Sequence, residues 1–283
     1  MDPAQLDKTL TRYIRSDTFP VAIKLVKPGE ALPDRVKRPA QMGLKVTICQ
    51  SVAMSRRYGW VVATSEQDMS CAPAAAAFGF KPMLTYMEEG HLCNQMYNAS
   101  LEAGANTEAA GEKLEHGEIE CVLSAPLQRC AFEPDVVLIY GNSAQVMRLV
   151  NAALWKEGGR LHSSFAGRLD CVDEIIIPLK SGKPEVILPC NGDRVFSQTQ
   201  DHEMAFSFPW DWADSIVEGL EGTHKGGVRY PIPTFLQYSP SYPKHYLRMD
   251  EIWRRWDCRV EFIRPSVAVG RMNSALQREY LDR

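Results

Sequence analysis

Short runs of apolar residues, separated by turns rich in proline and glycine, are the main pattern of this chain. The clearest run covers residues 134–140 (PDVVLIY), and an earlier one covers 20–26 (PVAIKLV). Runs of this length between turn residues are typical of strands that are buried on both faces. We expect further strands at 60–64, 119–123 and 259–263, and a β-hairpin with arms at 175–179 and 185–188.

Helix signals alternate with these strands. Thr47 stands three residues before Gln50, which is the capping-box spacing, and Gly59 is placed to end the same helix. A second helix is expected to have Ser70 as its N-cap and Cys71 as its first residue. Strands that alternate with helices predict a mixed α/β fold. The remaining helices are expected at 1–18, 84–105 and 144–155, with a charged helical tail after the last strand.

The two clearest strands begin segments that resemble each other, which indicates an internal duplication. Gly59 and Cys71 recur 100 residues later as Gly159 and Cys171. In both segments a helix ending at glycine is followed by an extended piece and then by the cysteine. The duplicated unit of strand, helix and hairpin would occupy residues of about 20–80 and 134–195.

The sequence changes character after Pro209. Tryptophan, tyrosine and proline are frequent in the segment 210–256, which a charged stretch follows. We therefore expect an α/β body at 1–209 and an aromatic, proline-rich C-terminal segment, 210–283, packed on the same domain. Such a segment can cover one face of the body or form the interface of a homo-oligomer.

Composition narrows the class of protein. With 283 residues and 45% hydrophobic content, the chain is long enough for a buried core. A net charge of −3 gives no basic field for nucleic acid, and no run of about 18 apolar residues predicts a membrane helix. The polar N-terminus lacks the apolar centre of a signal peptide, so we expect a cytoplasmic protein. In that reducing compartment the eight cysteines are expected as thiols, metal ligands or redox centres.

Four of the eight cysteines fall where secondary structure is expected to start or stop. Cys49 and Cys71 lie at helix starts, where unpaired amides and the helix dipole favour a thiolate. Cys190 closes an expected strand before a tight Asn-Gly turn, whose amides can bind an anion. Cys171 lies between two elements and is matched to Cys71 by the repeat. Since cysteines at element ends can converge on one point, we expect these four to be the ligands of a metal or cluster.

The stretch that follows the last of these cysteines adds three cofactor-binding candidates: Asn191, Gly192 and Arg194. The expected cofactor is an iron–sulfur cluster of the four-iron type, and zinc is the alternative. A further interpretation is that all the thiols pack in the core, as we expect for the other four cysteines: Cys93, Cys121, Cys130 and Cys258. No CxxC pair occurs, so the ligands would have to converge from distant segments.

These residues resemble a prokaryotic family known as domain of unknown function 169. The resemblance covers residues of about 15–235 and includes Cys49-Gln50, Arg57, Gly59, Cys71, Gly79, Cys171, the stretch 189–194 (PCNGDR) and the stretch 230–233 (YPIP). The family brings no established activity. Its resemblance implies occurrence in anaerobic bacteria and archaea, which is compatible with an oxygen-sensitive cluster.

Two functions follow as hypotheses. The first is an iron–sulfur protein of anaerobic metabolism that exchanges electrons with a redox partner protein or binds a small substrate. The second is a binding module without chemistry, whose cysteines are structural and whose aromatic segment forms a ligand pocket. No dinucleotide, phosphate-loop, hydrolase or metalloprotease motif occurs to identify a catalytic group, so the sequence leaves open whether the protein is an enzyme.

Overall fold

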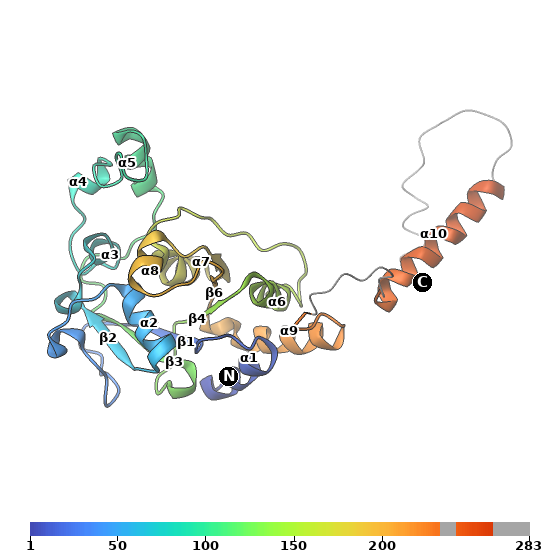
Figure 1. Ribbon diagram of the computed structural model, residues 1–283, viewed down its shortest axis with the longest axis horizontal. Coiled ribbons are helices and arrows are strands. Elements are labelled where there is room, and N and C mark those ends of the chain that lie inside the picture. The colour runs from blue at the N-terminus through green and yellow to red at the C-terminus, as the bar shows by residue number, and fades with distance from the viewer. Residues whose placement is uncertain (233–241, 263–283) are drawn as a thin grey trace. The chain divides into compact units, whose positions relative to one another are not determined.

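The computed structural model describes residues 1–232 and 242–262. The chain divides into a large unit, Met1–Ile232, and a second unit, Pro233–Arg283, whose described part is the helix α10 (Lys244–Phe262). The large unit contains a six-stranded sheet in the order β2-β3-β1-β4-β6-β5, and every neighbouring pair is antiparallel. Helices accompany this sheet (Figure 1), so the predicted mixed α/β class is confirmed.

The strands are β1 (Val21–Val26), β2 (Val62–Ser65), β3 (Cys121–Pro126), β4 (Val136–Gly141), β5 (Glu185–Ile187) and β6 (Met204–Pro209). The longer helices of the large unit are α1 (Pro3–Tyr13), α2 (Ile48–Tyr58), α5 (Leu101–Ala109), α6 (Ser143–Ala153) and α9 (Ala213–Lys225). The shorter helices are α3 (Ala72–Ala77), α4 (Thr85–Glu88), α7 (Ile177–Ser181) and α8 (Asn191–Phe196), together with a π-helix, η4 (Val172–Ile176). Short 3₁₀ turns are η1 (Pro39–Met42), η2 (Glu66–Asp68), η3 (Leu127–Arg129) and η5 (Trp210–Trp212).

Strand β4 explains why its sequence is a continuous apolar run. Val136, Leu138 and Tyr140 pack in one core, whereas Val137 and Ile139 pack in another on the opposite face. Helices α1, α6 and α9 supply the second core, and α2, α3 and η4 supply the first. Figure 1 shows α1 and α9 on one side of the sheet and α3, α7 and α8 on the other. Tyr140 thus points toward the layer that carries the cysteines.

Helix α2 begins and ends as predicted. Thr47 and Gln50 form the complete capping box, and Gly59 closes the helix at a φ of 71°. Serine hydroxyls hold the helix to the sheet: Ser51 Oγ lies 2.5 Å from Thr64 Oγ1, and Ser55 Oγ lies 2.8 Å from Ser124 Oγ. Buried hydroxyls that satisfy each other fix the position of the helix on the sheet, and with it the position of Cys49.

The prediction of a β-hairpin at 175–188 is wrong for the first arm, which is helical. Residues 172–181 form η4 and α7, and Gly182 ends them in the left-handed conformation at a φ of 65°. An apolar run of this length fits either a strand or a buried helix, and here Pro178 stands in the first turn of α7, where proline is tolerated. The second arm is confirmed as β5, which pairs with β6.

Other boundaries also differ from prediction. The expected Asn-Gly turn is the start of α8, and the backbone of Gly192 does not adopt a positive φ. Residues 84–105 contain α4 and the start of α5 with turns between them. The strand expected at 259–263 is wrong up to residue 262, because α10 continues to Phe262; residue 263 lies outside the described residues.

The two halves of the proposed duplication share some elements and not others. Strands β1 and β4 are neighbours in the sheet, each is followed by a helix, and Cys71 and Cys171 both stand at helix N-caps. Strand β2 lies between helix and cysteine in the first half, and no strand occupies that place in the second. Of the aromatic segment, residues 210–232 belong to the large unit through η5 and α9.

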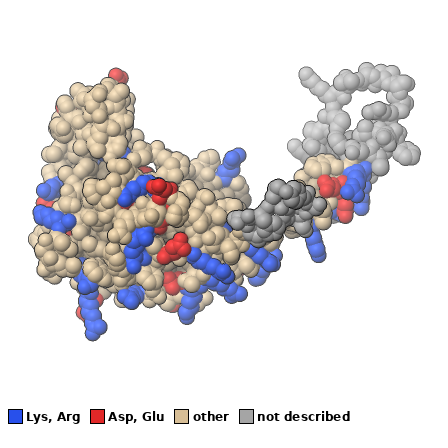
Figure 2. Space-filling model, in the orientation of Figure 1, with Lys and Arg blue, Asp and Glu red and all other residues tan. Residues whose placement is uncertain are grey.

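Within the described ranges, no helix combines the length and the apolar character needed to cross a membrane. On the face drawn in Figure 2, basic and acidic side chains lie interspersed over the large unit.

Candidate functional site

Each of the four predicted cysteines stands at the N-terminal end of a helix. Cys49 is the second residue of α2, and Cys71, Cys171 and Cys190 are the N-caps of α3, η4 and α8. Cys71 is therefore one position earlier than predicted, because the first helical residue is Ala72. Unpaired backbone amides lie at every one of these ends.

The carboxylate of Asp170 connects two of these helix ends directly, those of Cys171 and Cys190. Its Oδ1 accepts hydrogen bonds from the backbone N–H of Cys171 at 3.0 Å and from the thiol of Cys190 at 3.1 Å. Its Oδ2 accepts the backbone N–H of Cys190 at 2.9 Å. The charge on Asp170 also raises the pKa of all four thiols, including those of Cys49 and Cys71. Cys171 and Cys190 thus contact Asp170 directly, whereas its charge also acts on Cys49 and Cys71.

Burial decides the protonation of these thiols. It raises the pKa of Cys49 and of Cys190 to about 12 and that of Cys171 well above its usual value, and it also raises the pKa of Cys71. The prediction that helix starts favour thiolates here is therefore wrong for the metal-free chain, because loss of solvent outweighs the nearby amides. A metal that binds these sulfurs would have to displace their protons.

A layer of carboxylates lies beside the thiols, and the sequence analysis did not predict it. Asp170, Glu174 and Asp193 each offer one oxygen within 4.8 Å of the others, and all three residues are buried. The Tyr140 hydroxyl lies within hydrogen-bond distance of Glu174 and, at 3.1 Å, of Asp193. Burial raises the pKa of all three carboxyls, and the neighbouring carboxylates raise those of Asp170 and Glu174 further; that of Asp170 reaches about 6.

Arg56 connects this layer to the sheet. Its guanidinium is 1% exposed, donates to Glu203 at 2.7 Å and to Thr199 at 2.7 Å, and lies 3.8 Å from the centre of the Tyr140 ring. Thr199 in turn donates to Asp193 at 2.6 Å. Such a buried network holds each member in one orientation.

Two spacings in the sequence could have indicated these residues. Arg56 follows Cys49 by seven positions on α2, which places both on the same face of the helix. Asp170 and Glu174 are four positions apart, and this signal was lost because residues 175–179 were assigned to a strand.

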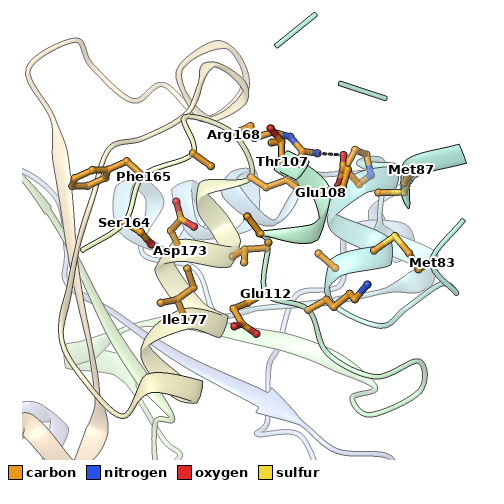
Figure 3. A pocket seen from close by; sticks show the side chains of 18 residues that line it. Met83, Met87, Thr107, Glu108, Glu112, Ser164, Phe165, Arg168, Asp173 and Ile177 are labelled. Carbon is orange, nitrogen blue, oxygen red and sulfur yellow. Dashed lines mark ion pairs between the residues drawn. The ribbon is translucent and has the colours of Figure 1, made fainter. Parts of the chain in front are cut away.

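A pocket of about 160 Å³ is lined in part by residues that neighbour two of the cysteines in the chain (Figure 3). Pro73, Val172 and Asp173 contribute to its wall, and they closely follow Cys71 and Cys171 in the chain. Its other lining residues include Met83, Met87, Phe165, Arg168 and Glu108, of which the last two form an ion pair at 2.9 Å. Burial, followed by the charges of Asp170 and Glu185, raises the pKa of Asp173 to about 7. The pocket therefore combines an apolar wall with charged groups near the thiols.

The other predicted cofactor residues lie differently. Asn191 is exposed, and Arg194 donates to the backbone oxygen of Gln200 at 2.7 Å. Gly192 lies against the Cys190 sulfur, where a Cβ on the glycine would stand 3.6 Å from Sγ. The structure thus brings Gly192 to the cysteine site and directs the Arg194 side chain to a neighbouring loop.

The remaining cysteines differ in their surroundings. Cys121 is fully buried in β3, and Cys130 donates to the backbone oxygen of Phe132 at 2.9 Å. The Cys93 thiol donates to Glu108 at 3.2 Å. The position of Cys258 is in α10, and its side chain lies outside the described residues.

The fold and the site together define a mixed α/β protein with four buried or half-buried cysteines at helix ends and a buried group of three carboxylates. The chain belongs to the family of domain of unknown function 169, described as uncharacterised ArCR, whose model matches residues 9–219. The chain is also 28% identical to an uncharacterised protein of Methanocaldococcus jannaschii over 223 residues, which are 76% of this chain and 91% of that protein. No solved structure matches the chain.

Proposed function

We propose that the protein holds an iron–sulfur cluster through Cys49, Cys71, Cys171 and Cys190 and serves in redox chemistry or small-molecule binding in anaerobic metabolism. One observation carries the proposal. Four cysteines that are far apart in the sequence each stand at the N-terminal end of a helix; Asp170 binds two of them directly, and its charge acts on all four. We infer that the protein works in the cytoplasm, where reducing conditions keep such thiols free of disulfides.

A single zinc ion could bind three or four of these sulfurs only if their positions changed. In the part of the chain that the structure describes, no three of these sulfurs lie within 4.8 Å of one another. Four sulfurs that bind one zinc ion share a sphere with a radius of about 2.3 Å and so lie closer together than this. A cluster spreads its ligands over several metal atoms, which suits a wider set of thiols.

The surroundings of the sulfurs also fit a cluster. Backbone amides at four helix ends can donate hydrogen bonds to sulfur, and such bonds raise the potential of a cluster. When bound through all four cysteines, the cluster would supply one-electron transfer. The chain's own contribution is to exclude water, to hold Cys190 through Asp170, and to present the pocket beside Cys71 and Cys171. A small molecule in that pocket, or a redox partner protein, would be the other participant.

The test is to measure iron, acid-labile sulfide and visible absorption on the full chain purified without oxygen. About four irons and four sulfides per chain are expected for a cubane-type cluster. Cys190→Ser should lose the cluster and its absorption. Cys121→Ser is the matched control, because Cys121 is buried in β3 and lies outside the site. Iron-free protein, or equal absorption in Cys190→Ser and wild type, would count against the proposal.

The pocket supports a second candidate, a ligand-binding module whose cysteines are structural. Its volume of about 160 Å³ and its methionine and phenylalanine lining suit a small organic molecule. Colourless, metal-free protein that stays folded after thiol alkylation and still binds a small molecule would favour this function. Replacement of Phe165, which lines the pocket, by serine should then weaken binding without changing the folded state.

A further inference from the structure

We propose that Asp170, Glu174 and Asp193 form a binding site for one divalent cation of the oxygen-preferring class, such as Mn²⁺ or Mg²⁺, next to the thiol site. The proposal does not depend on the iron–sulfur cluster, because it rests on different atoms. The three carboxylates each offer an oxygen within 4.8 Å of the others. Asp170 and Glu174 come from the start of η4 and Asp193 from α8, and the bonds of Asp170 to Cys190 hold the starts of the two helices together.

The arrangement of hydrogen bonds leaves particular oxygens free. On Glu174, Oε1 is bound by Tyr140, while Oε2 has no hydrogen-bond partner among the described residues. On Asp193, Oδ2 accepts from Thr199, while Oδ1 is likewise without a partner there. Both residues are 0% exposed, so water does not serve these oxygens at the surface. Donors that fix one oxygen and leave the other bare are the usual support of a metal-binding carboxylate.

A hydroxyl next to the carboxylates gives a second, independent indication. Ser197 is 1% exposed and lies beside Asp193 and Cys49. Its Oγ makes no hydrogen bond of good geometry within the described chain. A buried hydroxyl normally has a partner, so an unpartnered one beside two bare carboxylate oxygens indicates a missing ligand.

The balance of charge points to a divalent ion. The buried network contains four carboxylates, because Glu203 joins the three of the site. The guanidiniums that neutralise them belong to Arg56 and Arg57, both of which pair with Glu203. With all four carboxylates ionised, two negative charges would remain, and one divalent cation supplies the opposite charge; in the metal-free chain bound protons take this role. Isolated buried charges are strongly unfavourable, so a partner of this charge would stabilise the site.

The donor atoms select the class of ion. Carboxylate and hydroxyl oxygens are the ligands of Mg²⁺, Mn²⁺ and Ca²⁺, whereas thiolates bind zinc and iron–sulfur clusters. The cysteines and the carboxylates are thus two proposed sites of different chemistry. Asp170 lies between them, because it accepts hydrogen bonds from Cys190.

The experiment uses Mn²⁺ as the probe, on the full chain treated to remove metals. Bound Mn²⁺ is measured by paramagnetic resonance and equilibrium dialysis, with Mg²⁺ as competitor. One ion per chain is expected, with affinity reduced at least tenfold in Glu174→Gln, which removes a charge and keeps the shape. Glu185→Gln is the matched control, because Glu185 is a buried carboxylate on β5 outside the cluster, and it should bind as the wild type does.

Two further measurements deal with a variant that does not fold and separate the cation site from the cluster. Should Glu174→Gln fail to fold, a rise in the melting temperature of the wild-type chain with Mn²⁺, absent in Asp193→Asn, gives the same answer. Cys71→Ser should bind Mn²⁺ normally whether or not the protein contains iron, which separates this site from the cluster. Absence of Mn²⁺ binding in the folded wild type, or equal affinity in Glu174→Gln, would overturn the proposal and leave protons as the compensating charge.

Discussion

Asp170 binds Cys190 at two points, through the thiol at 3.1 Å and through the backbone N–H at 2.9 Å, although the two residues are 20 positions apart. The same carboxylate accepts the backbone N–H of Cys171. One side chain therefore ties the start of α8 to the start of η4. Because Asp170 is 2% exposed, its charge acts on the neighbouring thiols through a medium that screens it poorly.

The substitution Asp170→Asn should lower the pKa of the surrounding thiols in the metal-free protein. It removes the negative charge that raises the pKa of Cys49 and Cys190, while burial, the larger cause, remains. The variant should react faster with a thiol reagent at any fixed pH between 8 and 10, a range about the usual cysteine pKa. Its free energy of unfolding should fall by about 1–3 kcal/mol, because buried donors lose an ionised acceptor.

Asp135→Asn is the control for this change. Asp135 accepts the backbone N–H of Leu25 at 2.7 Å and is partly buried, but it lies at the other end of the sheet's central strands. It should show a comparable loss of stability and an unchanged thiol pH profile. If both variants shifted the profile equally, general loosening and not the charge of Asp170 would be the cause.

Replacing the N-cap residue of α2 tests whether Thr47 affects the reactivity of the Cys49 thiol in addition to the stability of the helix. Thr47 and Asn142 both form complete capping boxes, at the starts of α2 and α6. Replacing either by alanine should reduce the free energy of unfolding by about 1 kcal/mol. Only Thr47 also contacts a site cysteine, since its Oγ1 lies 2.8 Å from Cys49 Sγ and lowers the pKa of that thiol.

Thr47→Ala should therefore slow the alkylation of Cys49 at fixed pH, measured by peptide mass spectrometry. Asn142→Ala should leave that rate as in the wild type at equal loss of stability. Faster labelling of Cys49 in Thr47→Ala than in Asn142→Ala would show that exposure through local opening dominates, contrary to this expectation.

What the sequence predicted well depends on local rules. The capping box at Thr47, the glycine that ends α2 and the buried run that became β4 each follow from a few neighbouring residues. The helical character of 172–181 could not be read the same way, because an apolar run such as 175–179 fits a strand equally well without its packing partners.

The cysteines and the carboxylates of the site likewise differ in how far local sequence signals could indicate them. The four cysteines were selected because element ends are visible in sequence, and their convergence on one cofactor stays a prediction. The carboxylate layer depends on the start of α8 meeting the start of η4, so Asp193 and Glu174 gave no local signal of a common site. Arg56 looked like an ordinary basic residue near a helix end, and only the tertiary fold shows that it is buried against Tyr140.

Arg56 and Arg57 are neighbours that pair with the same carboxylate but differ in burial. The side chain of Arg56 is 1% exposed and that of Arg57 is 21% exposed, and both contact Glu203. Arg56→Met should reduce the free energy of unfolding by about 3–5 kcal/mol, because a buried ion pair loses one member and the carboxylates lose a positive neighbour. Arg57→Met should cost about 1 kcal/mol or less, because solvent screens its interaction.

Denaturant unfolding of the two variants, monitored by circular dichroism, gives the comparison. The ratio of the two effects is the informative quantity, since both substitutions remove one positive charge from the same helix end. Equal losses for Arg56→Met and Arg57→Met would mean that net charge, and not the buried network around Tyr140, governs stability here.

Asp173 should make the protein less stable as the pH rises through the weakly acidic range. Its pKa in the folded chain is raised to about 7, and an unfolded aspartate has a pKa of about 3.9. Between these values the unfolded chain loses the proton while the folded chain keeps it, so the free energy of unfolding falls. Below about pH 4 both states are protonated, and above about pH 7 both are ionised, so this contribution is then constant.

Asp173→Asn removes this dependence, because the amide does not titrate. The variant should equal or exceed the wild type above pH 7, by about 1–2 kcal/mol after allowance for the partial exposure of the side chain. The difference between the two should shrink as the pH falls toward 4. Urea unfolding at a series of pH values measures this difference, with Asp211→Asn as the control because Asp211 is an exposed carboxylate on η5. A constant difference between Asp173→Asn and wild type across the range would show that Asp173 ionises alike in both states.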